Sequence, residues 1–137
     1  MPNRRDLLKC AAGFNAFAFL AEAAGSLPNS VVNEKSAKLT TDTFGEVRIY
    51  FDGPTDQLKS MTAGSVKLKP GTQPHPPHEH PEEEFMIVTE GTGEITVEGK
   101  VTKVAPGSIM YCAGNKTHGI LNTGKTPLLF YFCKWKA

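Results

Sequence analysis

Three of the chain's four histidines lie in one short stretch, "HPPHEHPEEE", which covers residues 75–84. His78 and His80 are two residues apart, so on an extended backbone their side chains point to the same side. Glu84 begins the next apolar run, where a carboxylate is costly unless it is paired or bound to a metal. The stretch is therefore either a set of metal ligands or a solvated loop that happens to be rich in histidine and acid.

His118 favours the first of these interpretations. It begins a distant apolar run that continues through Ile120 to Asn122. Three imidazoles and one carboxylate form a mixed nitrogen and oxygen ligand set, which suits divalent transition metals, whereas Ca²⁺ and Mg²⁺ prefer oxygen alone. We expect one such ion, with Mn, Fe, Ni, Co, Cu and Zn all open, held by His78, His80, Glu84 and His118.

The neighbouring polar residues are given other roles. His75 lies between prolines and outside the ligand spacing, so we expect it at the rim or in solvent. Glu82 and Glu83 are expected to be loop charges, because three adjacent acids cannot all face one metal.

Short runs that alternate between apolar and polar residues must position these ligands. The runs are separated by turn residues, with 13 glycines and 10 prolines in the chain, and no segment favours a helix. About eight strands at regular spacing predict an all-β, antiparallel sandwich or barrel. The residues expected to face the interior are Val47, Ile49, Phe51, Val66, Leu68, Met86, Val88, Ile95, Val97 and Ile120.

Two motifs in these runs resemble those of the cupin family, over roughly residues 44–135. The first motif fits at Gly71, His78, His80, Glu84 and Gly91, with one extra residue after Gly71. The second fits at Gly107, His118 and Asn122. Ala113 replaces a proline and Asn115 a glycine there; both departures concern a turn rather than the ligands, and asparagine also tolerates left-handed geometry. The resemblance implies a single-domain cupin β-barrel (double-stranded β-helix jelly roll) and supports the four metal ligands.

The expected function depends on the coordination positions of the metal that the protein ligands leave unfilled. Four protein ligands on an octahedral ion would leave two positions for a small molecule, which is typical of a catalytic rather than a structural site. The apolar interior, with a substrate pocket expected to include Met86 and Asn122, favours an apolar or aromatic ligand. We therefore expect a metal-dependent enzyme, with a dioxygenase favoured and an isomerase or lyase next. The alternative is a non-catalytic metal- or ligand-binding cupin of the cell envelope, and analogy with cupins favours a homodimer.

Charge and cysteine content add little to this. Lys and Arg number 15 and Asp and Glu 14, with no basic block, so nothing indicates nucleic-acid binding. Cys112 and Cys133 lie in apolar runs, where free cysteine behaves as a small hydrophobe. We expect free thiols, with a disulfide as the alternative.

The N-terminus is typical of an export signal rather than of the folded domain. "NRRDLLK" at residues 3–9 resembles the twin-arginine motif, and a short apolar stretch and the small-residue sequence "AEA" follow it. The apolar stretch is much shorter than the ~18 residues of a membrane span. We expect a signal peptide over residues 1–23, an exposed arm over 24–43, the barrel over 44–135, and delivery to the periplasm or another exported location.

Overall fold

The computed structural model describes residues 25–137, so the predicted signal peptide lies outside the described residues. Nine antiparallel strands and one short 3₁₀ turn, Glu34–Ser36, make up this part of the chain. The strands are β1 (Lys38–Asp42), β2 (Gly45–Gly53), β3 (Ser60–Leu68), β4 (Glu83–Glu90), β5 (Gly93–Val97), β6 (Lys100–Val104), β7 (Ile109–Cys112), β8 (His118–Leu121) and β9 (Leu128–Lys136). The predicted all-β antiparallel class is confirmed.

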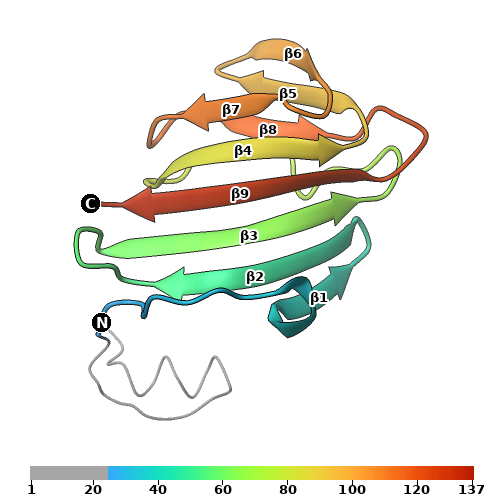
Figure 1. Cartoon of the computed structure of the whole chain (residues 1–137). Coiled ribbons are helices and arrows are strands. Elements are labelled where there is room, and N and C mark those ends of the chain that lie inside the picture. Colours follow the sequence, from blue (N-terminus) through green and yellow to red (C-terminus); the bar gives the residue numbers. More distant parts are fainter. Residues whose placement is uncertain (1–24) are drawn as a thin grey trace.

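The strands form two sheets that enclose one core. The larger sheet has the order β1-β2-β3-β9-β4-β7 and the smaller one the order β6-β5-β8. Figure 1 shows β2, β3, β9 and β4 side by side in one curved layer, with β5, β6 and β8 together at its β4 end. Strands that are distant in the sequence pair with one another, such as β3 with β9, which makes this a rolled jelly-roll arrangement rather than a simple meander.

Alternation along the strands explains which side chains reach the core. Val66 and Leu68 of β3 lie opposite Phe130 and Leu128 of β9, and all four are buried. Their shared face packs toward the smaller sheet, which contributes Ile95. The other members of the core cluster are Met86, Val88, Val104, Met110, Cys112 and Ile120.

One residue of the predicted interior set faces the other way. A β-bulge between Ile49 and Phe51 leaves Ile49 opposite Gly64 but places Phe51 opposite Ala63, the next residue along β3. Neighbouring residues of a strand point to opposite faces, so the extra residue in the bulge, Tyr50, reverses the alternation after it. The prediction that Phe51 faces the interior was therefore wrong, because a bulge changes register without any signal in the alternation.

The larger sheet begins earlier than residue 44. Lys38–Asp42 forms β1 and pairs with β2 from Lys38↔Ile49 to Asp42↔Gly45. Every residue of β1 is exposed, so this edge strand is held by backbone pairing rather than by burial of apolar side chains.

The two cysteines lie on opposite faces of the larger sheet. Cys112 is opposite Glu84 in the β4–β7 pair, whereas Cys133 is opposite Phe85 in the β4–β9 pair. Because Glu84 and Phe85 are consecutive, their side chains point in opposite directions. Both thiols are free, as expected, and burial raises the pKa of each.

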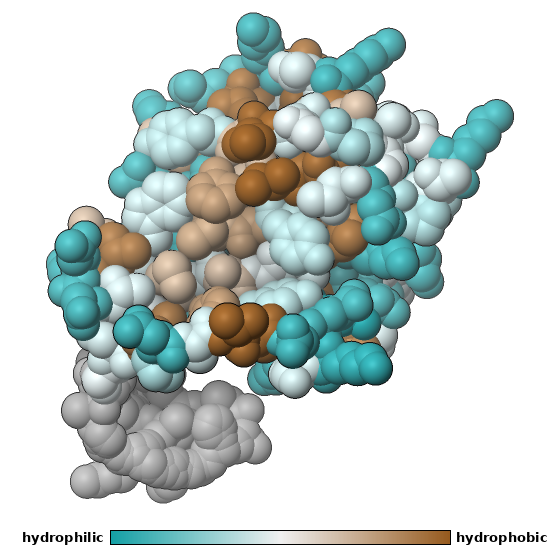
Figure 2. Space-filling model, viewed as in Figure 1, coloured by the Kyte–Doolittle hydropathy of each residue, from teal (hydrophilic) through white to brown (hydrophobic). Residues whose placement is uncertain are grey.

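The face of the larger sheet that is turned away from the core is partly apolar. Ile109, Ile87 and Tyr131 lie in one row across β7, β4 and β9, and Ile109 is 67% exposed. Tyr111 is also exposed, and the Tyr131 ring lies 6.3 Å from that of Tyr50. Figure 2 shows apolar and aromatic side chains gathered over the middle of the molecule, with hydrophilic side chains around them. Within residues 25–137, no helix is long and apolar enough to cross a bilayer.

Candidate metal centre

Three histidines converge inside the barrel. His78, His80 and His118 each present a ring nitrogen, and these three atoms lie within 4.8 Å of one another. His78 and His80 belong to the loop before β4 in the larger sheet, and His118 begins β8 in the smaller sheet. The structure therefore brings together residues about forty positions apart in the sequence, as the predicted ligand set requires.

Backbone hydrogen bonds fix the proline-rich loop against β8. His78 and His118 form an isolated antiparallel bridge, in which each N–H donates to the other's carbonyl at 2.9 Å. The N–H of Asn115 donates to the carbonyl of His80 at 2.7 Å. Asn115 has φ of 61°, which is the left-handed geometry that asparagine tolerates in place of glycine. The loop is thus a paired segment of the fold rather than a solvated connection.

Glu84 lies between two of the imidazoles. Its Oε1 is 2.9 Å from Nε2 of His80 and 3.1 Å from Nε2 of His118, and Glu84 is only 6% exposed. Burial by itself would raise the pKa of Glu84, but the hydrogen bonds with His118 and His80 outweigh burial and lower it. The carboxylate is therefore ionised, as a metal ligand must be.

The other ring nitrogens set the orientation of two imidazoles. Nδ1 of His80 lies 3.1 Å from the carbonyl of Glu82, and Nδ1 of His118 lies 3.0 Å from the carbonyl of Lys116. A carbonyl can only accept, so in each ring Nδ1 carries a proton and Nε2 is directed to the centre. This support of the second nitrogen is typical of histidines that bind metals.

The protonation of two of the rings, His78 and His118, also fits a cation. The hydrogen bond to Glu84 raises the pKa of His118, because the negative charge stabilises a second proton on that ring. Burial, followed by repulsion from His75, His118 and His80, lowers the pKa of His78 to about 4, so His78 is neutral with a free lone pair at pH 7. A divalent ion would replace the proton that His118 shares with Glu84, and the donor set therefore fits a transition metal.

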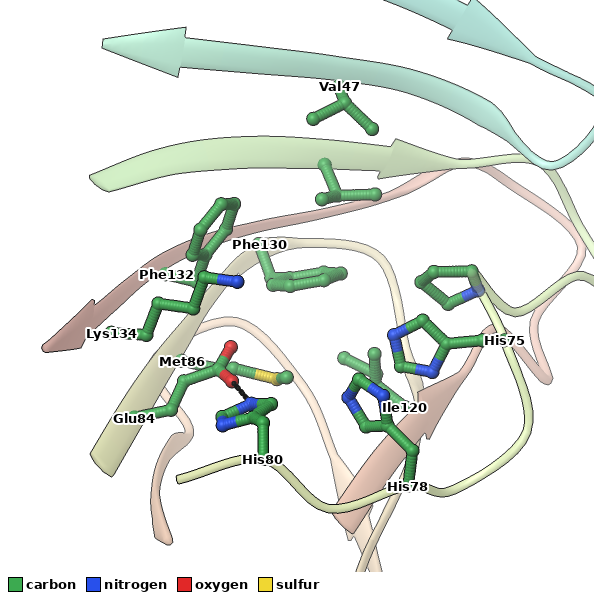
Figure 3. Close-up of a pocket in the computed structure, with 12 residues that line it drawn as sticks. Val47, His75, His78, His80, Glu84, Met86, Ile120, Phe130, Phe132 and Lys134 are labelled. Atoms are coloured by element: carbon green, nitrogen blue, oxygen red, sulfur yellow. Dashed lines mark hydrogen bonds and ion pairs between the residues drawn. The ribbon is translucent and has the colours of Figure 1, made fainter. Parts of the chain in front are cut away.

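His78 and His80 open into a cavity of about 140 Å³, whereas His118 is buried behind them and does not line it (Figure 3). His78, His80 and Glu84 line one side, and apolar side chains from the larger sheet line the other. Met86, which the sequence analysis assigns to a substrate pocket, is part of the cavity wall. The remaining apolar lining consists of Val47, Val66, Pro74, Ile120, Phe130 and Phe132.

Asn122 has a different place in the structure. It is fully buried and does not line this cavity. Its amide group donates to the carbonyls of Leu68 and Thr126, and its Oδ1 accepts from the N–H of Gly124. Asn122 thus ties the chain after β8 to the end of β3, which is a structural rather than a substrate-facing position.

His75 lies closer to the centre than the sequence indicates. It is half-buried, lines the cavity, and its ring lies 3.7 Å from that of His78. Glu82 and Glu83 do not line the cavity. The Oε1 of Glu82 lies 3.4 Å from Nδ1 of His80, and Glu83 accepts a hydrogen bond from the Tyr111 hydroxyl at 2.6 Å.

Lys134 is a lining residue that the sequence analysis missed. It lies on β9 directly opposite Glu84, and Figure 3 shows its side chain beside the Glu84 carboxylate and Phe132. Alternation through Leu128, Phe130 and Phe132 could have indicated it, because Lys134 is the next residue of the same face.

The fold and the site define a small β-barrel protein with a histidine- and carboxylate-lined cavity. The family model of the cupin domain (Cupin_2) matches residues 64–133, which is half of the chain. The chain belongs to the cupin family.

One curated relative shares part of the sequence. The chain is 33% identical over 82 residues to the dimethylsulfoniopropionate lyase DddW of Ruegeria pomeroyi. The match covers 58% of this chain and 53% of the lyase, so the chain spans about half the length of that relative.

Solved structures with similar folds are more distant in sequence. KdgF from a Halomonas species superimposes with a TM-score of 0.66 at 18% identity, covering 80% of this chain and 96% of that one. An RmlC-like cupin from Shewanella frigidimarina gives 0.65 at 15% identity, covering 80% and 93%. A predicted oxalate decarboxylase from Thermotoga maritima gives 0.64 at 21% identity, covering 79% and 100%. These likenesses confirm the cupin fold.

Proposed function

We propose that this protein is a metal-dependent enzyme that acts on a small molecule, with one divalent transition metal held by His78, His80, Glu84 and His118. The observation that carries the proposal is the convergence of the three ring nitrogens within 4.8 Å beside a buried, ionised carboxylate. His78, His80 and Glu84 of this cluster face a cavity rather than a closed core, which favours a site that handles a ligand over one that only stabilises the fold.

The chain's own residues would prepare this site in three ways. The carbonyls of Glu82 and Lys116 hold two imidazoles in the ligating orientation. Apolar side chains such as Phe130 and Phe132 exclude water from one side of the cavity. His75 and Lys134 add groups that can hold or donate a proton. A bound metal would supply Lewis acidity toward an oxygen of the substrate.

A lyase is the reaction class that we favour. The curated relative is named as a lyase of dimethylsulfoniopropionate, and a third of the matched residues are identical. The dioxygenase expected from the sequence is the second candidate, because the apolar wall of the cavity suits an apolar or aromatic substrate. A non-catalytic binding cupin is the third.

A substrate screen with defined metal content tests the proposal. The full chain is loaded separately with Mn²⁺, Fe²⁺, Co²⁺, Ni²⁺, Cu²⁺ and Zn²⁺. Loss of dimethylsulfoniopropionate is followed by proton NMR, and O₂ uptake is followed with phenols and diketones. Turnover that needs metal and is lost in His118→Ala supports an enzyme, and the reactive compound decides its class. Stable metal binding without turnover of any compound would favour the binding cupin, and failure to bind any of the metals would overturn the proposal.

A further inference from the structure

Lys134 places a positive charge in the wall of the cavity. It is opposite Glu84 in the antiparallel β4–β9 pair, and side chains at such positions have Cβ atoms about 4.5–5.5 Å apart. Among the described residues, Lys134 is the only lysine or arginine that lines the cavity.

No carboxylate of the described chain neutralises Lys134 directly. The ion pairs of Glu84 are with His80 and His118, and Lys134 takes part in no ion pair within residues 25–137. Lys134 is half-buried, and it follows the apolar residues Phe130 and Phe132 on the same face of β9. A charge in such surroundings is less well solvated than one at the surface, which favours an anionic partner.

The net charge of the site with a metal bound also favours an anionic ligand. This step rests on the proposed function, since it assumes a divalent ion held by the three imidazoles and Glu84. Glu84 would neutralise only one of the ion's two charges, and Lys134 would add another. The cavity would then carry two net positive charges and no negative group to balance them.

We propose that Lys134 binds the carboxylate of a small carboxylic-acid substrate, whose apolar part lies against Phe130, Phe132 and Met86. The cavity volume of about 140 Å³ limits the ligand to few heavy atoms, because a cavity of ~150 Å³ holds a molecule the size of benzene. A carboxylate fits an ammonium through charge-assisted hydrogen bonds, and the apolar wall fits a short carbon chain.

Binding of a plain carboxylate tests this assignment without relying on turnover. The full chain is loaded with Co²⁺, and propanoate is titrated while the visible absorption of the metal is followed. Propanamide, which has nearly the same shape but no charge, is the matched ligand control. Lys134→Met and Lys134→Gln remove the charge, Lys134→Arg keeps it, and Lys136→Met is the control on an exposed lysine of the same strand. Thermal unfolding and Co²⁺ stoichiometry are measured for each variant.

The expected results separate the two proposals. The wild type and Lys136→Met should prefer propanoate to propanamide, and the neutral variants should weaken propanoate binding by about 10–100-fold while keeping full Co²⁺ content. Lys134→Arg should retain most of the affinity. If the protein takes Co²⁺ but propanoate binds Lys134→Met or Lys134→Gln as tightly as the wild type, or no more tightly than propanamide, the role of Lys134 is overturned while the metal site stands. If the wild type takes no Co²⁺, the proposed function itself fails.

Discussion

Oε1 of Glu84 on β4 lies 3.1 Å from Nε2 of His118 on β8, which joins the two sheets of the barrel through a buried hydrogen bond. The same oxygen lies 2.9 Å from Nε2 of His80. A single carboxylate oxygen is thus hydrogen-bonded to imidazoles from two distant segments of the chain.

Alanine substitution of each proposed ligand should weaken metal binding by at least ~10-fold, because even changes in the groups that support ligands cost 10–100-fold. The variants are His78→Ala, His80→Ala, Glu84→Ala and His118→Ala. Metal content by elemental analysis and melting temperature with and without chelator measure the effect, and the loaded wild type should melt higher than the chelated form.

His75→Ala is the matched control for that series. The His75 ring stacks on His78 but lies outside the ligand cluster, so its loss should cost much less metal affinity than the loss of any ligand. Full metal content in His118→Ala together with loss of metal in His75→Ala would contradict the ligand assignment.

Acid should destabilise the metal-free protein through His78. The pKa of His78 falls from 6.5 to about 4 on folding, chiefly through burial, so below about pH 6.5 the unfolded chain binds a proton that the folded chain does not. The free energy of unfolding should therefore fall between about pH 6.5 and pH 4. His118 acts in the opposite direction because its pKa is raised, and its contribution is lost as the pH rises through that value.

Chemical denaturation in chelator at pH 7, 5.5 and 4.5 measures this effect. His78→Asn should lose less stability than the wild type between pH 7 and pH 4.5, because asparagine cannot take up a proton. An equal loss in both proteins would show that His78 does not cause the acid sensitivity.

Asn122→Ala should destabilise the fold by about 2–4 kcal/mol without removing the metal site. Its side chain makes three hydrogen bonds and is fully buried, so the substitution leaves buried polar groups of the backbone without partners. Urea unfolding gives the loss of stability, and metal titration of the folded variant tests the site. A metal-binding defect with unchanged stability would instead support the expectation from the sequence that Asn122 belongs to the substrate pocket.

Export stays a prediction of the sequence alone. Replacement of Arg4 and Arg5 by lysine should retain the protein in the cytoplasm, because the twin-arginine pathway reads the paired arginines. Cell fractionation and immunoblotting of the two forms make the comparison, and unchanged delivery to the periplasm would rule out the signal peptide.

The predicted homodimer is also open to test. Ile109, Tyr111 and Tyr131 expose apolar surface on the larger sheet, and exposed apolar patches often mark interaction sites. We expect a second copy of the chain to cover this face, so sedimentation velocity should show a dimer for the wild type and a monomer for Ile109→Lys with Tyr131→Glu. A monomeric wild type at micromolar concentration would contradict this prediction.

Local patterns predicted the strands and the grouping of the histidines. Alternation and spacing are properties of neighbouring residues, so Met86 could be placed on the inner face and His78 and His80 on one side of the chain. The pairing of His118 with that loop depends on contacts across the fold, so the residue types could suggest His118 as a ligand and the family resemblance supported it, but no local pattern showed the contact.

Other features had no local signal. The bulge at Tyr50 turned Phe51 to the outer face, although the alternation around it is regular. Strand β1 is polar and fully exposed, so no apolar period marked it. Lys134 had only a weak signal, because it continues the alternation of Leu128, Phe130 and Phe132 in a strand whose other face also carries large side chains.

The bridge between His78 and His118 has a consequence for the order of assembly. In an unfolded chain only His78, His80 and Glu84 are near one another, and such a short segment is a weak chelator. The fourth donor arrives when the smaller sheet closes over the larger one and the bridge forms. Tight uptake must therefore follow closure of the barrel, and the colour of a bound cobalt ion would report, during refolding, the moment at which the two sheets meet.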